Sequence, residues 1–247
     1  MVPDGTNEFG PDRYGRSFAD VYDDWYDDVS DAEATAAFID RFGPNQKLLE
    51  LGVGTGRLSI PISTNGHWVV GVDASTDMLD RFRSTPTSDA VGGTMEILPF
   101  RDGAFDTVLV ATNTFFNLHT EADQRRCFAE CRRVLRLGGR MVIEAMLPGT
   151  PDPQLDRLVT TRSIDVDTAV LTATIRDSNS QEITGQHIEI SESGIRMRPW
   201  KIRYATPAQL DDMANSSGLR LGQRFSGWGD APVDDDASNA VSIYTAI

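Results

Sequence analysis

The clearest chemical pattern in this chain is the segment 50–56, ELGVGTG, which follows a short apolar run. Glycines at the end of a strand let the chain turn sharply and let a ligand lie against bare backbone. Asp73 follows about 20 residues later, where a carboxylate can accept hydrogen bonds from ribose hydroxyls. These residues predict that a ligand with a ribose binds where the first strand of an α/β sheet ends.

The spacing of the glycines separates two classes of ribose-bearing cofactor. Nicotinamide enzymes carry Gly-x-Gly-x-x-Gly, whereas this chain reads Gly-x-Gly-x-Gly and has Arg57 where the third glycine would stand. The acid Glu50 would repel a pyrophosphate, but it suits a ligand with an ammonium and a sulfonium group. The pattern therefore favours S-adenosylmethionine (SAM) over a nicotinamide dinucleotide.

Charge and composition limit the classes of partner. The 247 residues include 37 acidic and 23 basic ones, for a formal net charge of −14. Such a charge repels phosphate backbones, so we expect a small-molecule substrate and no nucleic acid. No apolar run approaches the roughly 18 residues of a membrane span, and residues 1–12 lack the pattern of a secretory signal. We therefore expect no membrane partner and a cytoplasmic location; the oligomeric state stays open, a homodimer included.

The chain has two cysteines, Cys127 and Cys131, which lie four residues apart in a predicted helix. With the neighbouring apolar residues they fit the buried face of that helix. No Cys-x-x-Cys pair and no histidine cluster accompanies them. We therefore expect two reduced core residues and no metal site.

Alternating strands and helices place the glycine segment in a Rossmann-like fold. Strands are predicted over 47–51, 68–72, 94–98, 107–111 and 140–145, and helices over 31–42, 58–65, 75–83 and 121–137. This alternation is typical of an α/β, doubly wound, mostly parallel sheet. A helix over 207–217 and strands over 219–225 and 240–246, the last two as a hairpin, complete a seven-stranded sheet.

Between the fifth strand and the last helix, the pattern changes to alternating Thr, Ile and Val. It predicts an antiparallel insertion with strands over 157–165, 169–177, 182–191 and 195–205. We interpret the chain 1–247 as a single domain made of four segments. These are an N-terminal helical lid (1–45), a cofactor-binding core (46–147), a substrate cover (148–206) and the end of the core sheet (207–247).

The motifs of the core resemble those of the class I SAM-dependent methyltransferases. The glycine segment matches their first motif, and Asp73 and Met78 match the ribose acid and the apolar residue near the adenine. The segments 98–106 and 135–140 resemble those before the fourth and fifth strands, so the likeness covers about residues 45–145. This family often has an acid at the start of the third strand. Thr94 stands there in this chain, and Met95 and Glu96 are the alternatives.

The N-terminal region resembles that of small-molecule N-methyltransferases, including the aminosugar and amine types. The likeness rests on Tyr14-Gly15 and on residues 18–26, and it implies that Tyr26 lies over the cofactor. Residues 113–117 also resemble a segment of peptide α-N-methyltransferases. The antiparallel insertion matches the substrate cover of the aminosugar enzymes, which implies a small-molecule acceptor.

Motif positions and resemblance together name the candidate site residues. The cofactor candidates are Tyr14, Tyr22, Tyr26, Glu50, Gly52, Gly54, Gly56, Arg57, Asp73, Ala74, Met78, Met95, Glu96 and Thr112. The acceptor candidates are Phe115, Phe116, Trp200, Arg203 and Tyr204, and the catalytic candidates are Tyr26, Asn117 and His119. Each has a plainer alternative: the aromatic residues can pack in the core, Arg57 can face solvent, and Asn117 can cap a turn.

The acceptor chemistry depends on whether a base is present. An amine needs only to arrive neutral, whereas a hydroxyl usually needs a base or a metal. The histidines are His67, His119 and His187, and we expect His67 on the surface, far from the site. The sequence favours N-methylation, with O-methylation by His119 or His187 as base the alternative. Outside methyl transfer, a nicotinamide-dependent oxidoreductase and a non-catalytic Rossmann-like binding module are the competing hypotheses.

Overall fold

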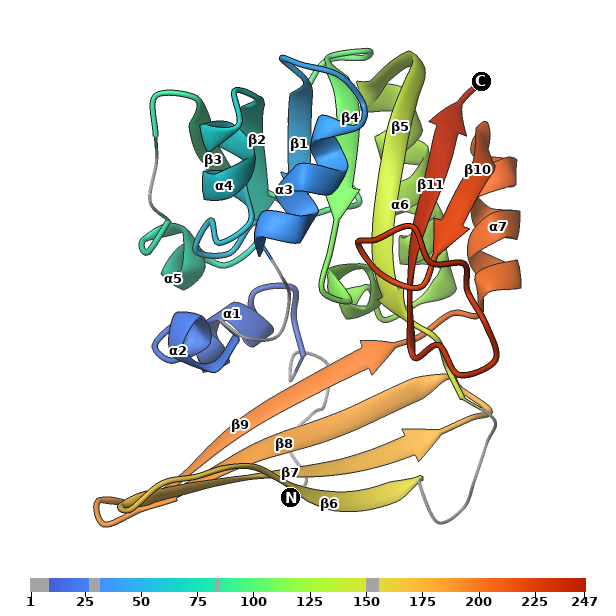
Figure 1. The fold of residues 1–247 in the computed structure, drawn as a ribbon. Helices are drawn as coiled ribbons and strands as arrows, with labels where there is room; N and C mark the ends of the chain where they lie inside the picture. Colours follow the sequence, from blue (N-terminus) through green and yellow to red (C-terminus); the bar gives the residue numbers. More distant parts are fainter. Residues whose placement is uncertain (1–8, 27–31, 83–84, 150–155) are drawn as a thin grey trace.

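The computed structural model describes residues 9–26, 32–82, 85–149 and 156–247. Its body is a seven-stranded sheet in the order β10-β11-β5-β4-β1-β2-β3 (Figure 1). The strands are β1 (Lys47–Leu51), β2 (Trp68–Asp73), β3 (Ser88–Gly92), β4 (Phe105–Val110), β5 (Leu135–Met146), β10 (Leu219–Phe225) and β11 (Asn239–Ala246). The first five are parallel, and β11 runs antiparallel to both β5 and β10. The predicted fold class is confirmed.

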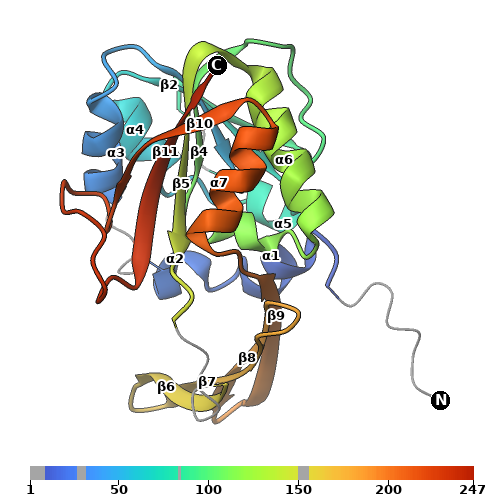
Figure 2. The same cartoon turned by 90° about the vertical axis from the view of Figure 1, so that its right-hand side faces the viewer.

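Helices cover both faces of this sheet. They are α3 (Ala32–Asp40), α4 (Ser59–Thr64), α5 (Thr76–Leu79), the 3-10 helix η1 (Thr114–Asn117), α6 (Glu121–Val134) and α7 (Pro207–Ser216). Figure 2 shows α3 and α4 on one side of the sheet and α6 and α7 on the other. Along β1, Leu48 packs in the cluster on the α3 side, whereas Leu49 and Leu51 pack in the cluster on the α6 side. Both faces of the strand are therefore buried, which explains its continuous apolar run.

A second sheet lies beyond the carboxyl ends of the parallel strands (Figure 1). It has four antiparallel strands in sequence order: β6 (Arg157–Ile164), β7 (Thr168–Asp177), β8 (Glu182–Ser191) and β9 (Gly194–Arg203). We call it the cover sheet. Two short helices, α1 (Arg13–Phe18) and α2 (Tyr22–Tyr26), lie between it and the core. We call residues 9–26 the N-terminal lid.

Three elements differ most from the sequence prediction. The third strand is Ser88–Gly92 instead of 94–98, because this half-buried edge strand carries little apolar signal. The helix predicted over 75–83 has only the four residues Thr76–Leu79. The strand β5 begins at Leu135, where the continuation of α6 was expected. Helix α3, which falls in the predicted segment 1–45, packs on the core through Phe38 and Ile39.

Other predicted features can be placed on this fold. Cys127 and Cys131 are free and fully buried in the core. No helix in the described part of the chain is long and apolar enough to span a membrane. Among these same residues, no group of three or more His, Cys, Asp and Glu side chains could hold a metal ion.

Candidate active site

A cavity of about 270 Å³ opens at the carboxyl ends of β1 and β2. We call it the main cavity. Its walls come from the loops after β1, β2 and β3, from the N-terminal lid, and from the segment that follows β4. The predicted residues that line it are Tyr14, Tyr22, Gly52, Gly54, Asp73, Ala74, Met78, Met95, Glu96, Asn117 and His119. The fold thus brings together residues that lie more than a hundred positions apart in the sequence.

Asp73 ends β2 with its carboxylate held in place by backbone amides. Its Oδ2 accepts a hydrogen bond from the Gly54 amide at 2.9 Å, and its Oδ1 accepts one from the Ser75 amide at 2.8 Å. Burial raises the pKa of this carboxyl group, while the amide hydrogen bonds oppose that shift. Each oxygen retains a further lone pair for a ligand, so Asp73 can accept hydrogen bonds from two ribose hydroxyls.

The glycines of the first turn have different roles. Gly52 and Gly54 line the main cavity and have φ values of +71° and +56°. A Cβ on Gly52 would lie 2.2 Å from Thr114, so this position also needs the space. Gly56 does not line the cavity, and a Cβ there would lie 2.9 Å from the ring of Phe82. The structure thus places Gly56 in a packing position.

Glu50 is buried beside the main cavity. Its Oε2 accepts a hydrogen bond from Ser59 Oγ at 2.5 Å, and burial raises its pKa to about 7. Glu50 lines a small recess with Arg57 and Thr112, and Gly52 lies in the walls of both this recess and the main cavity. A cation beside Glu50 would favour the ionised carboxylate, so the recess suits an ammonium group.

The loop after β4 has a strained backbone. Thr112 and Asn113 have φ values of +53° and +62°, which is uncommon for residues other than glycine. Two hydrogen bonds to β5 hold them: the Thr112 amide donates to Glu144 Oε2 at 2.8 Å, and the Met146 amide donates to Asn113 Oδ1 at 2.6 Å. Such strain persists only where the surroundings impose it. The strained loop leads directly into η1, whose Thr114 and Asn117 line the main cavity.

The three candidate tyrosines form one cluster in the lid. Tyr14 and Tyr22 line the main cavity, and Tyr26 lies behind them. Tyr14 Oη donates a hydrogen bond to Tyr26 Oη at 2.9 Å, and the rings of Tyr22 and Tyr26 stack with their centroids 4.8 Å apart. Burial raises the pKa of Tyr22 to about 12. The structure therefore places Tyr14 and Tyr22, both neutral, on the wall and Tyr26 as their support.

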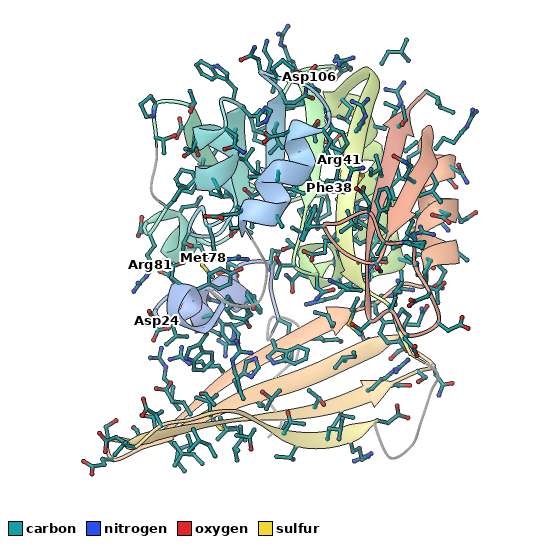
Figure 3. All side chains as sticks on the ribbon, in the orientation of Figure 1. Asp24, Phe38, Arg41, Met78, Arg81 and Asp106 are labelled. Atoms are coloured by element: carbon teal, nitrogen blue, oxygen red, sulfur yellow. The ribbon has the colours of Figure 1, made fainter. Side chains whose placement is uncertain are left out.

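The lid contacts the core closely. A Cβ on Gly15 would lie 2.3 Å from Ser75 and 2.9 Å from Met78, so glycine lets α1 approach α5. Figure 3 shows Met78 of α5 next to the lid helices, where it packs in one cluster with Phe18 and Ala19. Thr55 Oγ1 also donates a hydrogen bond to Asp23 Oδ1 at 2.5 Å. These contacts close the cofactor side of the cavity.

Arginines of the cover sheet hold the other side of the lid. The Arg198 side chain is 1% exposed, and its Nη1 donates to the Ser17 carbonyl at 2.6 Å and to Asp20 Oδ1 at 2.7 Å. Arg162 Nη2 donates to the Trp25 carbonyl at 2.6 Å. Because a buried guanidinium needs partners for its donors, these bonds fix the lid against the cover sheet.

His119 and Asn117 lie where the main cavity approaches β9. His119 Nε2 lies 3.0 Å from the Lys201 carbonyl oxygen. A carbonyl only accepts, so Nε2 carries the hydrogen and Nδ1 of the neutral ring has the lone pair. Burial lowers the pKa of His119, which keeps the ring neutral at pH 7. His119 can therefore accept a proton or a hydrogen bond at the cavity.

Four acceptor candidates lie outside the wall of the main cavity. Phe115 and Phe116 are fully buried, because η1 directs both rings into the core. Tyr204 is also buried in that core. Arg203 Nη1 donates to Gln124 Oε1 at 2.8 Å, which joins β9 to α6. The structure gives these four residues packing and anchoring contacts.

The remaining candidates lie near the cavity or far from it. Trp200 lines a smaller recess next to Asn117. His187 is buried under Phe18 and Trp25, so it faces neither the main cavity nor solvent. His67 is 1% exposed and forms a 2.8 Å contact with Asp40. The expectation of a surface position for His67 was wrong, because the Gln46 amide also donates to its Nδ1 within the core.

Residues that the sequence did not single out also line the main cavity, among them Phe9, Pro11 and Asp123. Asp123 could have been noticed, because it lies in the first turn of α6, where an acid is favourable. Phe9 and Pro11 come before the first helix, and no local pattern marks them.

The comparisons with known proteins agree with this geometry. A methyltransferase domain model matches residues 49–143. The CcbJ methyltransferase from Streptomyces caelestis is 32% identical, with a TM-score of 0.88, and the match covers 95% of this chain and 98% of that chain. The chain belongs to the SAM-dependent methyltransferase family, and its cofactor is SAM.

Two other comparisons are less extensive. The demethylmenaquinone methyltransferase of Mycobacterium bovis (strain BCG / Pasteur 1173P2) is 36% identical over 105 residues, which span 42% of this chain and 42% of that protein. CalS10, an amino pentose methyltransferase from Micromonospora echinaspora whose structure has SAM bound, is 20% identical. Its TM-score is 0.69 over 90% of this chain and 92% of that chain, which shows a common fold.

The residues of the main cavity fit SAM. Asp73 presents two oxygens to a ribose, the bare backbone of Gly54 leaves room beside them, and Glu50 suits the ammonium end. Met78 and Met95 line the same cavity with apolar side chains, which suit an adenine ring. SAM, unlike NAD, has no pyrophosphate that would bind at a helix N-terminus. In agreement with this, Arg57 occupies the position of the third glycine of the nicotinamide fingerprint.

Proposed function

We propose that this protein transfers the methyl group of SAM to an amine nitrogen of a small molecule bound beneath the cover sheet. The observation that carries the proposal is the continuity of the main cavity: Asp73 and Gly54 line its cofactor end, and Asn117 and His119 line its other end. Donor and acceptor can therefore meet in one continuous space.

The chemistry requires little from the chain beyond alignment. SAM supplies an electrophilic methyl carbon on a sulfonium, to which the amine lone pair bonds while the C–S electron pair remains on sulfur. The chain holds donor and acceptor in line, and such proximity contributes roughly 7–11 kcal/mol. The electron-rich faces of Tyr14 and Tyr22 attract a sulfonium at the cavity.

His119 has the properties needed to keep the acceptor neutral. An amine arrives mostly as an ammonium ion at pH 7, and it must lose a proton before its lone pair can react. Burial lowers the pKa of His119, so the ring is neutral at pH 7 and its Nδ1 lone pair can accept this proton. Asn117, beside it, can hydrogen-bond the acceptor.

O-methylation is the second candidate, and the same histidine supports it. His119 is the one histidine that lines the main cavity among the residues described, so a hydroxyl acceptor would use it as base. His187 is buried away from that cavity. We favour an amine because its lone pair needs no general base in the transition state.

The test is a methyl-transfer assay with matched acceptors. The purified protein is incubated with SAM and with pairs that differ only in the acceptor atom, such as benzylamine and benzyl alcohol or cyclohexylamine and cyclohexanol. Mass spectrometry identifies the products. We expect methylated amines only; methylated alcohols would support the second candidate, and no methyl transfer with any pair would contradict the proposal.

A further inference from the structure

A side recess adjoins the main cavity between the lid and β9. Asn117 and His119 line both spaces, and the side recess continues past them to Arg13 of α1 and to Trp200 of β9. The side recess has a volume of about 20 Å³, which is room for one water-sized group, so an acceptor whose amine lies at His119 can place a single oxygen there. What this recess binds would determine which acceptors the enzyme accepts.

Two nitrogen donors in residues of this recess lack partners. Arg13 Nε and Trp200 Nε1 are buried, and neither has a hydrogen-bond partner among the described residues. Buried N–H groups in native proteins are nearly always paired, so each unpaired one requires an explanation. Both groups only donate, and a ligand that satisfies them must present an oxygen or another hydrogen-bond acceptor.

The cover sheet provides space for the indole at this position. Trp200 is paired with Gly185 of β8, and a Cβ on Gly185 would lie 2.3 Å from two carbons of the indole ring. The glycine thus lets the ring lie flat on the sheet, next to the lid. Trp200 also packs against the cluster of Phe18, Ala19 and Met78, and its ring centroid lies 6.0 Å from that of His187, so neighbours on the lid and on β8 hold the indole in place.

The charges around the recess favour an anionic or strongly polar ligand group. Its charged residues in the described chain are Arg13 and Lys201. The Lys201 ammonium is paired with Glu182 at 2.6 Å, so its charge is largely compensated. The Arg13 guanidinium therefore dominates, and a guanidinium binds carboxylates and carbonyl oxygens.

We propose that the side recess binds a carboxylate or carboxamide oxygen of the methyl acceptor through Arg13 and Trp200. This inference rests on the proposed function and specifies its substrate class. The acceptor is then an amine that carries a carbonyl oxygen on the same small frame. Arg13 and Trp200 act as specificity-determining residues, whereas the reacting nitrogen lies at His119.

The first experiment compares acceptors that differ in one group. One set is trans-4-aminocyclohexanecarboxylate, its carboxamide and cyclohexylamine; the other is phenylalanine, phenylalaninamide and phenethylamine. Affinities are measured by titration into the protein saturated with S-adenosylhomocysteine. We expect at least one oxygen-bearing compound to bind about tenfold more tightly than the hydrocarbon amine of its set, because charged hydrogen bonds contribute at that level.

The outcomes separate the sources of the oxygen. If the carboxylate binds more tightly than the carboxamide, the acceptor group is anionic. If the carboxamide binds more tightly, the group is a neutral carbonyl. Equal affinity across each set, or no binding of any member to a protein that binds S-adenosylhomocysteine, would overturn the inference.

The second experiment assigns the effect to the two donors. Arg13→Met and Trp200→Phe keep the size or the ring of the side chain but remove a donor, and each should abolish most of the preference for oxygen. Arg13→Lys should restore part of the preference for the carboxylate. The control is Arg16→Met on the same helix, whose side chain is exposed and paired with Asp12; it should behave as the wild type.

A structural effect and a failed proposal can be distinguished. Affinity for S-adenosylhomocysteine reports on the cofactor end, and it should stay unchanged in the Arg13 and Trp200 variants. Methyl transfer to amines without any oxygen preference would contradict this inference alone. An oxygen preference in binding without any methyl transfer would contradict the proposed function alone.

Discussion

The two ends of the cavity are built in different ways. The cofactor end consists of backbone turns at the tips of adjacent parallel strands, where Gly54 and Asp73 are joined by a hydrogen bond of 2.9 Å. The acceptor end consists of side chains from the lid, from the loop after β4 and from the cover sheet, such as Arg13, His119 and Trp200. The first is made by local sequence and the fold, whereas the second depends on how distant segments pack. Variants at the two ends should therefore affect different measurements.

The largest effect is expected at the cofactor end. Asp73→Ala should weaken binding of S-adenosylhomocysteine about a thousandfold, because two charge-assisted hydrogen bonds to the ribose are lost. Calorimetric titration measures this affinity. Asp77→Ala, on the exposed side of α5, is the control; a loss below tenfold in Asp73→Ala would contradict the ribose assignment.

The next effect concerns turnover at the acceptor end. His119→Gln should lower kcat about a hundredfold, because the group that removes the ammonium proton before methyl transfer is lost, while affinity for S-adenosylhomocysteine stays unchanged. In the wild type, burial lowers the pKa of His119, so kcat should fall as the pH drops below 6.5 and the ring becomes protonated. Kinetic pH profiles of both proteins check this. A variant with unchanged kcat would remove His119 from the mechanism.

The third prediction concerns the contact between lid and cover sheet. Burial lowers the pKa of His187 to about 4, whereas the unfolded chain titrates near its ordinary value of about 6.5. Between pH 6.5 and 4 the unfolded chain binds a proton at His187 and the folded chain does not. The free energy of unfolding is therefore highest above pH 6.5 and falls as the pH drops towards 4. The loss should be about 2 kcal/mol for a partly solvated ring.

Denaturant unfolding at pH 7 and pH 4 measures that loss in the wild type and in His187→Gln. The variant cannot titrate in this range, so its free energy of unfolding should fall less between the two pH values. If the free energy of unfolding falls by the same amount in both proteins, His187 is not buried as a neutral group.

The smallest effect is expected behind the cavity wall. Tyr26→Phe removes the hydrogen bond that Tyr14 donates and should lower kcat about fivefold, with little change in thermal stability. Tyr204→Phe is the control, because its hydroxyl bonds to Arg176 away from the cavity. If the two variants have the same kcat, Tyr26 has only a packing role.

The same contrast explains how much the sequence could predict. The glycine segment, Asp73 and the alternation of strands and helices along the chain follow from local spacing, so the fold class could be predicted and the cofactor end proposed. The third strand was misplaced, because its burial depends on a single neighbour at the sheet edge. Phe115 and Phe116 follow β4 as expected, but only the strained backbone at Thr112 and Asn113 determines that their rings turn into the core.

The acceptor end was less predictable because its residues meet through tertiary contacts. Arg13 lies just outside the Tyr14-Gly15 motif, and it lines the side recess with Trp200 because distant segments pack together. A homodimer stays a prediction. So does the division of the chain into four segments.

Calorimetric titration of the purified protein with S-adenosylhomocysteine, and in parallel with NAD, tests the central claim most directly. The preformed carboxylate of Asp73, the buried Glu50 and Arg57 in place of the third glycine predict saturable binding of S-adenosylhomocysteine and no binding of NAD. Binding of NAD, or failure to bind S-adenosylhomocysteine, would contradict the account of the cofactor end.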